Sequence, residues 1–124
     1  MDLLKISATF NICMENARTM LPHKDEVLKV LDEAEKKIEA FPDDQKDEEK
    51  MPLMIAMVRS CLNGEYPLNN EDAIAAVVGA ALYLNEGDII PDEIPLIGIM
   101  DDLAVIDLAY KRCTNEVNAY RLWK

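Results

Sequence analysis

The sequence predicts an all-α protein, a compact bundle of about five helices. Apolar residues recur at alternating spacings of three and four in several separate stretches, which is the signature of amphipathic helices. No stretch shows the strict alternation or the hairpin turns that are typical of β-strands. The chain has 124 residues, of which 50% are hydrophobic, so it can bury one core. We therefore expect residues 1–124 to form a single helical domain.

Two amphipathic helices are predicted in the first third of the chain. The first begins near Leu3 and ends near Pro22, with an apolar stripe of Leu3, Ile6, Phe10, Cys13, Ala17 and Met20. The second begins around Lys24, with a stripe of Val27, Leu31, Ala34, Ile38 and Phe41. Charged residues fill the rest of its surface, so we expect that surface to face solvent.

Residues 42–52 are predicted to form an acidic linker, because five acidic residues and almost no apolar residues lie there. Pro52 suits the first turn of a third helix, Leu53 to Leu62. That helix is apolar on nearly all sides, which favours a central position. Asn63 and Gly64 are expected to end it.

The last two helices flank a segment rich in aspartate and proline. Asn69 or Asn70 is expected to cap the fourth helix, which ends near residues 85–87. The fifth is expected to start near Ile99 and run toward Leu122. Its apolar stripe is Leu103, Ile106, Tyr110, Cys113, Val117 and Tyr120.

The three cysteines, Cys13, Cys61 and Cys113, are far apart and form no Cys-x-x-Cys pair. Each lies on the apolar side of a predicted helix, where a free thiol behaves as a small hydrophobic side chain. We expect all three to be core residues. The absence of a disulfide framework is typical of a cytoplasmic protein.

The most specific string in the chain runs from residue 88 to residue 102 as DIIPDEIPLIGIMDD. Prolines fix φ and remove backbone donors, and a glycine permits conformations that other residues resist. Aspartates accept hydrogen bonds from free amides of turns and helix starts. The string therefore predicts a rigid turn between the last two helices, in which the structural and capping residues are Asp88, Pro91, Asp92, Pro95, Gly98, Asp101 and Asp102.

This string resembles the signature of the YkvA-like family, a domain of unknown function. The matching positions are Asp88-Ile-Ile-Pro-Asp92, Ile94-Pro95, Gly98 and Asp101-Asp102. The resemblance is clear over about residues 75–105 and weaker to the end, so residues 75–124 form the YkvA-like segment. Glu86 stands where the family often has proline. The resemblance implies a small helical domain and no particular activity.

Composition excludes several classes of function. The net charge of −11 and the pI near 4.4 oppose nucleic-acid binding, which requires phosphate neutralisation. The longest uncharged run, Ala73 to Asn85, is shorter than the roughly 20 residues that cross a bilayer. With no secretory signal, we expect a cytoplasmic, soluble protein without a transmembrane segment.

Catalysis is not favoured, because the sequence holds no glycine-rich phosphate loop and no nucleophile paired with a base. We expect no cofactor. The leading hypothesis is a small acidic binding protein that engages a basic protein partner, as an inhibitor, a toxin-immunity protein or an adaptor. Its predicted acidic face comprises Glu65, Glu71, Asp72, Glu86, Asp88, Asp92, Glu93 and Asp107.

The alternative hypothesis is a divalent-metal-binding protein or a metal-dependent enzyme. Oxygen ligands suit Mg²⁺, Ca²⁺ or Mn²⁺, and the candidate ligands are Asp88, Asp92, Asp101 and Asp102. A membrane scaffold is the remaining class. Arg121 and Lys124 alone make a poor anchor to anionic lipid, so we expect Trp123 to pack in the core or in a dimer.

Overall fold

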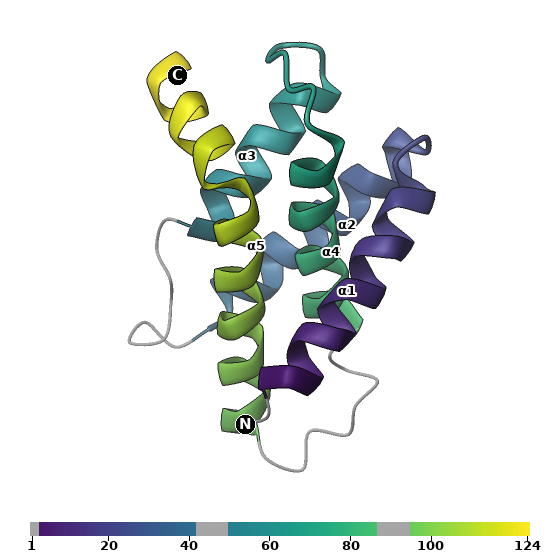
Figure 1. The fold of residues 1–124 in the computed structure, drawn as a ribbon, viewed down its shortest axis with the longest axis vertical. Coiled ribbons are helices and arrows are strands. Elements are labelled where there is room, and N and C mark those ends of the chain that lie inside the picture. The colour runs from purple at the N-terminus through teal and green to yellow at the C-terminus, as the bar shows by residue number, and fades with distance from the viewer. Residues whose placement is uncertain (1–2, 42–49, 87–94) are drawn as a thin grey trace.

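The computed structural model describes residues 3–41, 50–86 and 95–124. These residues form five helices and no strand, which confirms the all-α prediction (Figure 1): α1 (Leu3–Met20), α2 (Lys24–Glu39), α3 (Lys50–Leu62), α4 (Glu71–Glu86) and α5 (Pro95–Trp123). Their buried side chains join into one hydrophobic cluster. Helix α4 contacts each of the other four helices, so it is the central element of the bundle.

The central position of α4 follows from its small side chains. Eight of its residues are fully buried: Ala73, Ala75, Ala76, Val77, Val78, Ala80, Ala81 and Leu84. Gly79 faces Met14 of α1 so closely that an added Cβ would lie 3.1 Å from the Met14 Cα. Because small residues leave the backbones free to approach, α1 lies directly against α4 in Figure 1.

The predicted stripes of the first two helices largely match the buried residues. In α2 the whole predicted stripe is buried, including Phe41 just after the helix end. In α1 the buried residues are Ile6, Phe10, Cys13, Met14 and Ala17. Leu3 departs from the prediction, since its side chain is 61% exposed in the first turn of α1.

Helix α3 begins at Lys50, three residues before the predicted start. Residues 50–52 of the predicted linker therefore belong to the helix, while residues 42–49 lie outside the described residues. Pro52 occupies the first turn, as predicted, because the missing amide there needs no helical partner. The helix ends at Leu62, and Gly64 follows with a positive φ of 78°.

Asn70 caps helix α4. Its side-chain Oδ1 accepts a hydrogen bond from the backbone N–H of Ala73 at 3.2 Å. Glu71 and Asp72 occupy the first turn, where the helix dipole favours negative charge. The prediction of an asparagine cap is confirmed, with Asn70 rather than Asn69 as the residue that makes it.

Helix α5 begins at Pro95, four residues before its predicted start near Ile99. Pro95 and Gly98 are therefore helical residues, which corrects their assignment to a turn without regular structure. Proline suits the first helical position because its fixed φ is already helical. An interior glycine costs a helix only about 1 kcal/mol. The helix kinks at Cys113, whose φ of −127° and ψ of 21° are non-helical.

The cysteines are free thiols in different environments. Cys13 and Cys113 are buried, whereas Cys61 is half-buried, so the prediction of core positions holds fully for two of them. The Cys113 thiol donates to the carbonyl oxygen of Ala109 at 3.2 Å. Burial, with a smaller contribution from nearby Glu116, raises the pKa of Cys113 from 9.0 to about 12.

Candidate functional site

A buried ion pair lies at one end of the bundle, which we call the charged end. The charged end consists of the first turn of α1, the first two turns of α5 and the last turns of α2 and α4 (Figure 1). The Lys37 Nζ of α2 lies 3.8 Å from the Asp102 Oδ2 of α5, and the Asp102 side chain is only 6% exposed. A carboxylate in such an environment requires a counter-charge. Lys37 supplies it.

Two further hydrogen bonds tie α2 to the last turn of α4. The Lys37 ammonium also donates to the carbonyl oxygen of Leu84. The Asn85 side-chain amide donates to the carbonyl oxygen of Val30 at 3.1 Å. Since the last carbonyls of a helix have no partner within it, the ammonium satisfies one of them and complements the helix dipole. Lys37 therefore holds α2, α4 and α5 together.

Asp101 has a different environment from its neighbour Asp102. One of its side-chain oxygens, Oδ1, is buried and has no hydrogen-bond partner in the described part of the chain. Both aspartates were predicted as caps at the start of the fifth helix. Because α5 begins at Pro95, they lie in its second turn, and Asp102 is paired with a lysine side chain rather than with free backbone amides.

The predicted metal set is only partly described. Asp88 and Asp92 lie outside the described residues, as does Pro91 of the predicted turn. Among residues 3–41, 50–86 and 95–124, no three histidine, cysteine, aspartate or glutamate side chains are placed to hold a metal ion together. The cation next to Asp102 is the Lys37 ammonium.

Four of the eight residues of the predicted acidic face have described side chains: Glu65, Glu71, Asp72 and Asp107. Glu65 and Glu71 are exposed near the start of α4, whereas Glu86 ends that helix, about 22 Å away at 1.5 Å per residue. The side chain of Glu86 and residues Asp88, Asp92 and Glu93 are outside the description.

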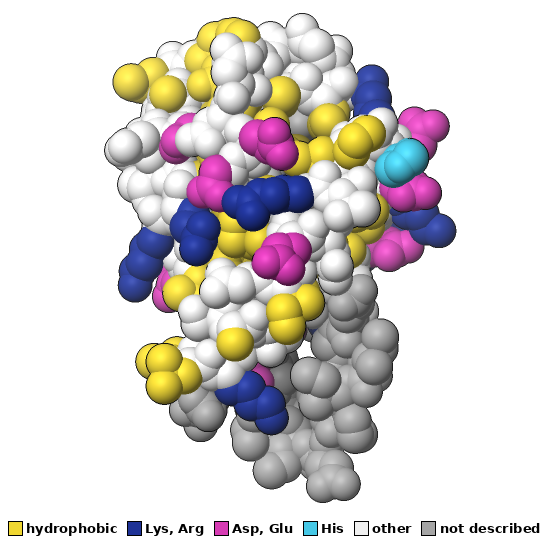
Figure 2. Space-filling model, turned by 45° about the vertical axis from the view of Figure 1, so that its right-hand side comes forward, with side chains coloured by type: hydrophobic (Ala, Val, Ile, Leu, Met, Phe, Trp, Pro, Cys, Tyr) yellow, Lys and Arg dark blue, Asp and Glu magenta, His cyan; other side chains and the backbone are white. Residues whose placement is uncertain are grey.

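Two more members of that face, Asp72 and Asp107, form ion pairs on the bundle surface. Asp72 contacts Arg18 at 2.5 Å and Arg112 at 3.7 Å, and Asp107 contacts Lys50 at 2.7 Å. The view in Figure 2 shows basic and acidic side chains next to one another rather than in separate areas. Residues 60–110 contain no lysine or arginine, so the cationic partners of these two carboxylates come from outside that interval.

The remaining negative charge is unevenly distributed along the chain. The described residues hold 15 acidic and 12 basic side chains, a net charge of −3. Eight of the eleven net negative charges therefore belong to residues 1–2, 42–49 and 87–94. In the sequence, residues 1–2 precede α1, residues 42–49 connect α2 to α3, and residues 87–94 connect α4 to α5, so each segment is continuous with at least one helix terminus of the charged end.

Sequence reasoning missed Lys37, the residue that organises the charged end. It is one of several lysines in α2, and nothing in its immediate sequence distinguishes it. A weak signal existed, because Lys37 lies beside Ile38 of the buried stripe and in the last turn of α2. A long side chain there can reach both the core edge and a neighbouring helix end.

Comparison with known proteins gives one informative relative. Over 69 residues, 55% of this chain, the sequence is 35% identical to a protein of Bacillus subtilis (strain 168) named uncharacterized membrane protein YkvA. The match spans 65% of that relative's length, less than two thirds. No family model and no solved structure matches. In the described residues of the present chain, none of the helices combines the length and apolarity needed to span a bilayer. The chain thus contains a YkvA-like segment, as its aspartate- and proline-rich string indicates.

Proposed function

We propose that this is a non-catalytic binding protein that engages a basic surface of a protein partner through its charged end. The observation that carries the proposal is the concentration of eight of the eleven net negative charges in segments that adjoin this end. Clustered charge of one sign attracts an oppositely charged surface, which raises association rates and favours the correct partner. An inhibitor, a toxin-immunity protein or an adaptor would each use such a surface.

The fold supports this proposal by fixing the helix termini from which the acidic segments continue. Lys37 joins α2, α4 and α5 through Asp102 and the Leu84 carbonyl oxygen. The electrostatic screening length is about 8 Å at physiological salt. Charges that lie within this distance of one another act together on a partner, whereas more widely spread charges are screened from one another.

A groove beside the start of α1 offers no catalytic arrangement. It has a volume of about 520 Å³ and is lined by Leu3, Leu4, Ser7, Leu103, Ala104, Asp107, Leu108 and Lys111. Its carboxylate, Asp107, already pairs with Lys50, and its serine has no histidine beside it in the lining. General acid–base chemistry requires a positioned group with a suitable pKa. This lining favours binding over catalysis.

The test is affinity capture with matched charge variants. The first variant, E86Q/D88N/D92N/E93Q, removes four negative charges near the charged end. The control, E15Q/D25N/E26Q/E33Q, removes four from exposed positions of α1 and α2 outside the charged end. We expect a basic protein to be captured from a lysate of the source organism at low salt and released as salt rises. The first variant should lose it and the control should keep it.

Two results would contradict the proposal. One is a partner that both variants retain equally, because the contact would then lie elsewhere. The other is a partner whose binding does not respond to salt. Circular dichroism and thermal melting of both variants establish that each is folded before the capture results are compared.

A second candidate function, divalent-cation binding, is favoured by the buried Asp101 Oδ1 that lacks a hydrogen-bond partner among the described residues. Oxygen ligands suit Mg²⁺, Ca²⁺ or Mn²⁺. Titration calorimetry with each ion at millimolar concentration tests it, and D101N should abolish any heat. Absence of heat from the unmodified protein eliminates this candidate and leaves the partner proposal untouched.

A further inference from the structure

The turn after α3 contains the only asparagine–glycine pair in the chain, Asn63-Gly64. Helix α3 ends there in a Schellman motif, in which two backbone amides beyond the helix bond back to its last turn. The Gly64 N–H donates to the Cys61 carbonyl oxygen at 3.0 Å. The Glu65 N–H donates to the Ser60 carbonyl oxygen at 2.9 Å. The motif requires a left-handed residue just after the helix, which Gly64 supplies with its φ of 78°.

The surroundings of this pair are open. Asn63 and Gly64 are both exposed. Apart from the adjacent residues, no heavy atom lies within 4 Å of the position that a Cβ on Gly64 would occupy. Since glycine has no side chain, nothing on Gly64 shields its amide nitrogen from the Asn63 side chain. Such a nitrogen is well placed along the chain to close a five-membered ring on the side-chain amide carbon.

We propose that Asn63 is a site of spontaneous self-modification, in which the Gly64 backbone nitrogen displaces the side-chain amide. Hydroxide removes the amide proton of Gly64, and the nitrogen forms a bond to the Asn63 Cγ. The bond between Cγ and Nδ2 breaks, and Nδ2 takes up a proton from water and leaves as ammonia. The product is a succinimide ring that includes the backbone carbonyl of Asn63.

Water then opens the ring at either of its two carbonyl carbons. Opening at Cγ leaves an aspartate with an ordinary main chain at position 63. Opening at the backbone carbonyl leaves an isoaspartate, whose main chain passes through the former side chain and is longer by one carbon atom. Both products add a negative charge at the C-terminal end of α3, where the helix dipole disfavours it. The longer main chain also shifts Gly64 and Glu65 away from their carbonyl partners.

The folded turn slows this reaction. The Gly64 N–H is held by the Cys61 carbonyl oxygen, so its nitrogen attacks only when the end of α3 opens. Helix ends open locally at a lower free-energy cost than the rest of a fold. The reaction therefore proceeds through the open form, and its rate depends on how often the cap opens.

The same turn positions Tyr66, which contacts the end of α5. The Tyr66 N–H donates to the Ser60 carbonyl oxygen at 3.3 Å. The Tyr66 ring centroid lies 5.1 Å from that of Tyr120 and 5.0 Å from that of Trp123. The Trp123 side chain is nevertheless 50% exposed, so the expectation that it packs in the core holds for only one side of the indole.

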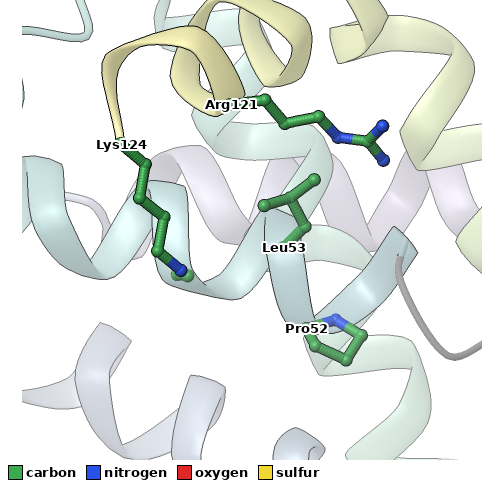
Figure 3. A pocket seen from close by; sticks show the side chains of 5 residues that line it. Pro52, Leu53, Arg121 and Lys124 are labelled. Atoms are coloured by element: carbon green, nitrogen blue, oxygen red, sulfur yellow. The ribbon is translucent and has the colours of Figure 1, made fainter.

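The end of α5 packs less closely on the first turns of α3. A groove of about 460 Å³ lies there, lined by Pro52, Leu53, Ala56, Arg121 and Lys124 (Figure 3). Because the packing between the two helices is incomplete at this point, Trp123 depends on its neighbouring rings. A displaced Tyr66 leaves the indole more hydrated. The modification of Asn63 thus reaches the end of α5 through Tyr66.

The test begins with incubation of the full chain at mildly alkaline pH. Proteolysis and mass spectrometry then detect the exchange of the amide NH₂ for OH at each asparagine. We expect Asn63 to lose its amide at least about tenfold faster than Asn16 and Asn118, which are exposed and precede alanine. In urea, Asn63 should react about tenfold faster than in buffer, because the cap hydrogen bonds are absent. Gly64→Ala should slow the reaction in urea about tenfold, since a Cβ shields the nitrogen.

Trp123 reports the structural consequence, because it is the only tryptophan in the chain. Ion exchange separates the isoaspartate form by its added charge. Its Trp123 emission should lie at longer wavelength than that of the unmodified protein. Asn63→Ser has no side-chain amide to displace, so its emission should stay constant throughout the incubation. Asn63→Asp adds the charge without lengthening the main chain and should shift the emission less than the isoaspartate form.

Three results would overturn the proposal. The first is that Asn63 keeps its amide as long as Asn16 and Asn118 do. The second is an equal rate of reaction in buffer and in urea, which would mean that the cap does not control the reaction. The third is an isoaspartate form whose Trp123 emission equals that of the unmodified protein, which would separate the turn from the end of α5.

Discussion

Two ion pairs in this protein have the same chemistry and very different surroundings. Lys37 and Asp102 meet at the charged end with side chains that are 27% and 6% exposed. Arg18 and Asp72 meet on the bundle surface with side chains that are 45% and 48% exposed. The surface contact is the shorter one, 2.5 Å against 3.8 Å. A ranking by the N–O distance alone would therefore wrongly make the surface pair the more costly one to break.

The comparison indicates that burial, rather than distance, determines how strongly stability depends on each ion pair. Water screens the surface pair and competes for its hydrogen bonds, so it contributes little to stability. The buried carboxylate of Asp102 has lost most of its hydration and depends on Lys37. A buried pair of this kind need not raise net stability, but breaking it by removing one partner is costly. Four predictions extend this contrast to other buried and exposed polar groups, from the largest expected effect to the smallest.

The largest loss of stability is expected from the substitution Lys37→Met. This change leaves the Asp102 carboxylate buried without its lysine counter-charge and also removes the donor to the Leu84 carbonyl oxygen. The free energy of unfolding should fall by about 3 kcal/mol. Urea denaturation followed by circular dichroism measures it.

A double variant provides the control for this prediction. In K37M/D102N both charges are absent, so the penalty for an uncompensated buried carboxylate disappears. The double variant should therefore be more stable than K37M alone. If K37M and K37M/D102N unfold at the same urea concentration, the buried charge is not the cause of the loss.

The second effect concerns the buried thiol of Cys113, whose pKa is raised from 9.0 to about 12. Between these values the unfolded chain releases the proton while the folded chain keeps it. The contribution of this thiol to stability is therefore complete below pH 9.0 and is lost as pH rises toward 12. The expected slope is about 1.4 kcal/mol per pH unit.

Urea denaturation at a series of pH values below and above 9.0 gives this slope. Other groups also titrate there, so the informative quantity is the difference between the unmodified protein and Cys113→Ala. The variant should have the shallower slope. Parallel curves would show that the Cys113 thiol ionises equally in the folded and unfolded chains.

The third prediction distinguishes two contacts of the Asn70 side chain: the hydrogen bond that caps α4 and the exposed hydrogen bond to Glu116. Asn70 accepts a hydrogen bond from the Ala73 amide and donates one to the Glu116 carboxylate at 2.7 Å. Asn70→Ala loses both and should lower the free energy of unfolding by about 1 kcal/mol. Asn70→Asp keeps an acceptor for the amide but loses the donor to Glu116. Thermal melting should place Asn70→Asp above Asn70→Ala, and the reverse order would mean that repulsion between the new carboxylate and Glu116 outweighs the retained cap.

The helices could be predicted from the sequence because the spacing of apolar residues that indicates a helix is a local pattern. The stripe from Val27 to Phe41 repeats every three or four residues, and each of its members is buried. The start of α5 was placed four residues too late, because Pro95 and Gly98 read equally well as turn residues and as the first turn of a helix. Boundaries depend on how neighbouring helices pack, and that information is not local.

The candidate site was less predictable for the same reason. Asp102 was identified from the string around it, but its partner Lys37 lies on another helix and far away in the sequence. Arg18 and Lys50 likewise neutralise Asp72 and Asp107 from outside the interval that holds no lysine or arginine. Counting charges along the chain gives the total correctly. It does not say which charges meet, because the packing of the helices decides that.

The smallest effect is expected from Asp72→Asn, which removes the carboxylate from its contacts with Arg18 and Arg112. Since these side chains are nearly half exposed, the free energy of unfolding should change by no more than about 0.5 kcal/mol. It should change less still at high salt, because screening weakens the pairs beforehand. Urea denaturation at low and high salt measures both quantities. A loss that approaches that of Lys37→Met would mean that two cations around one carboxylate act as a network, and burial would no longer separate the two kinds of ion pair.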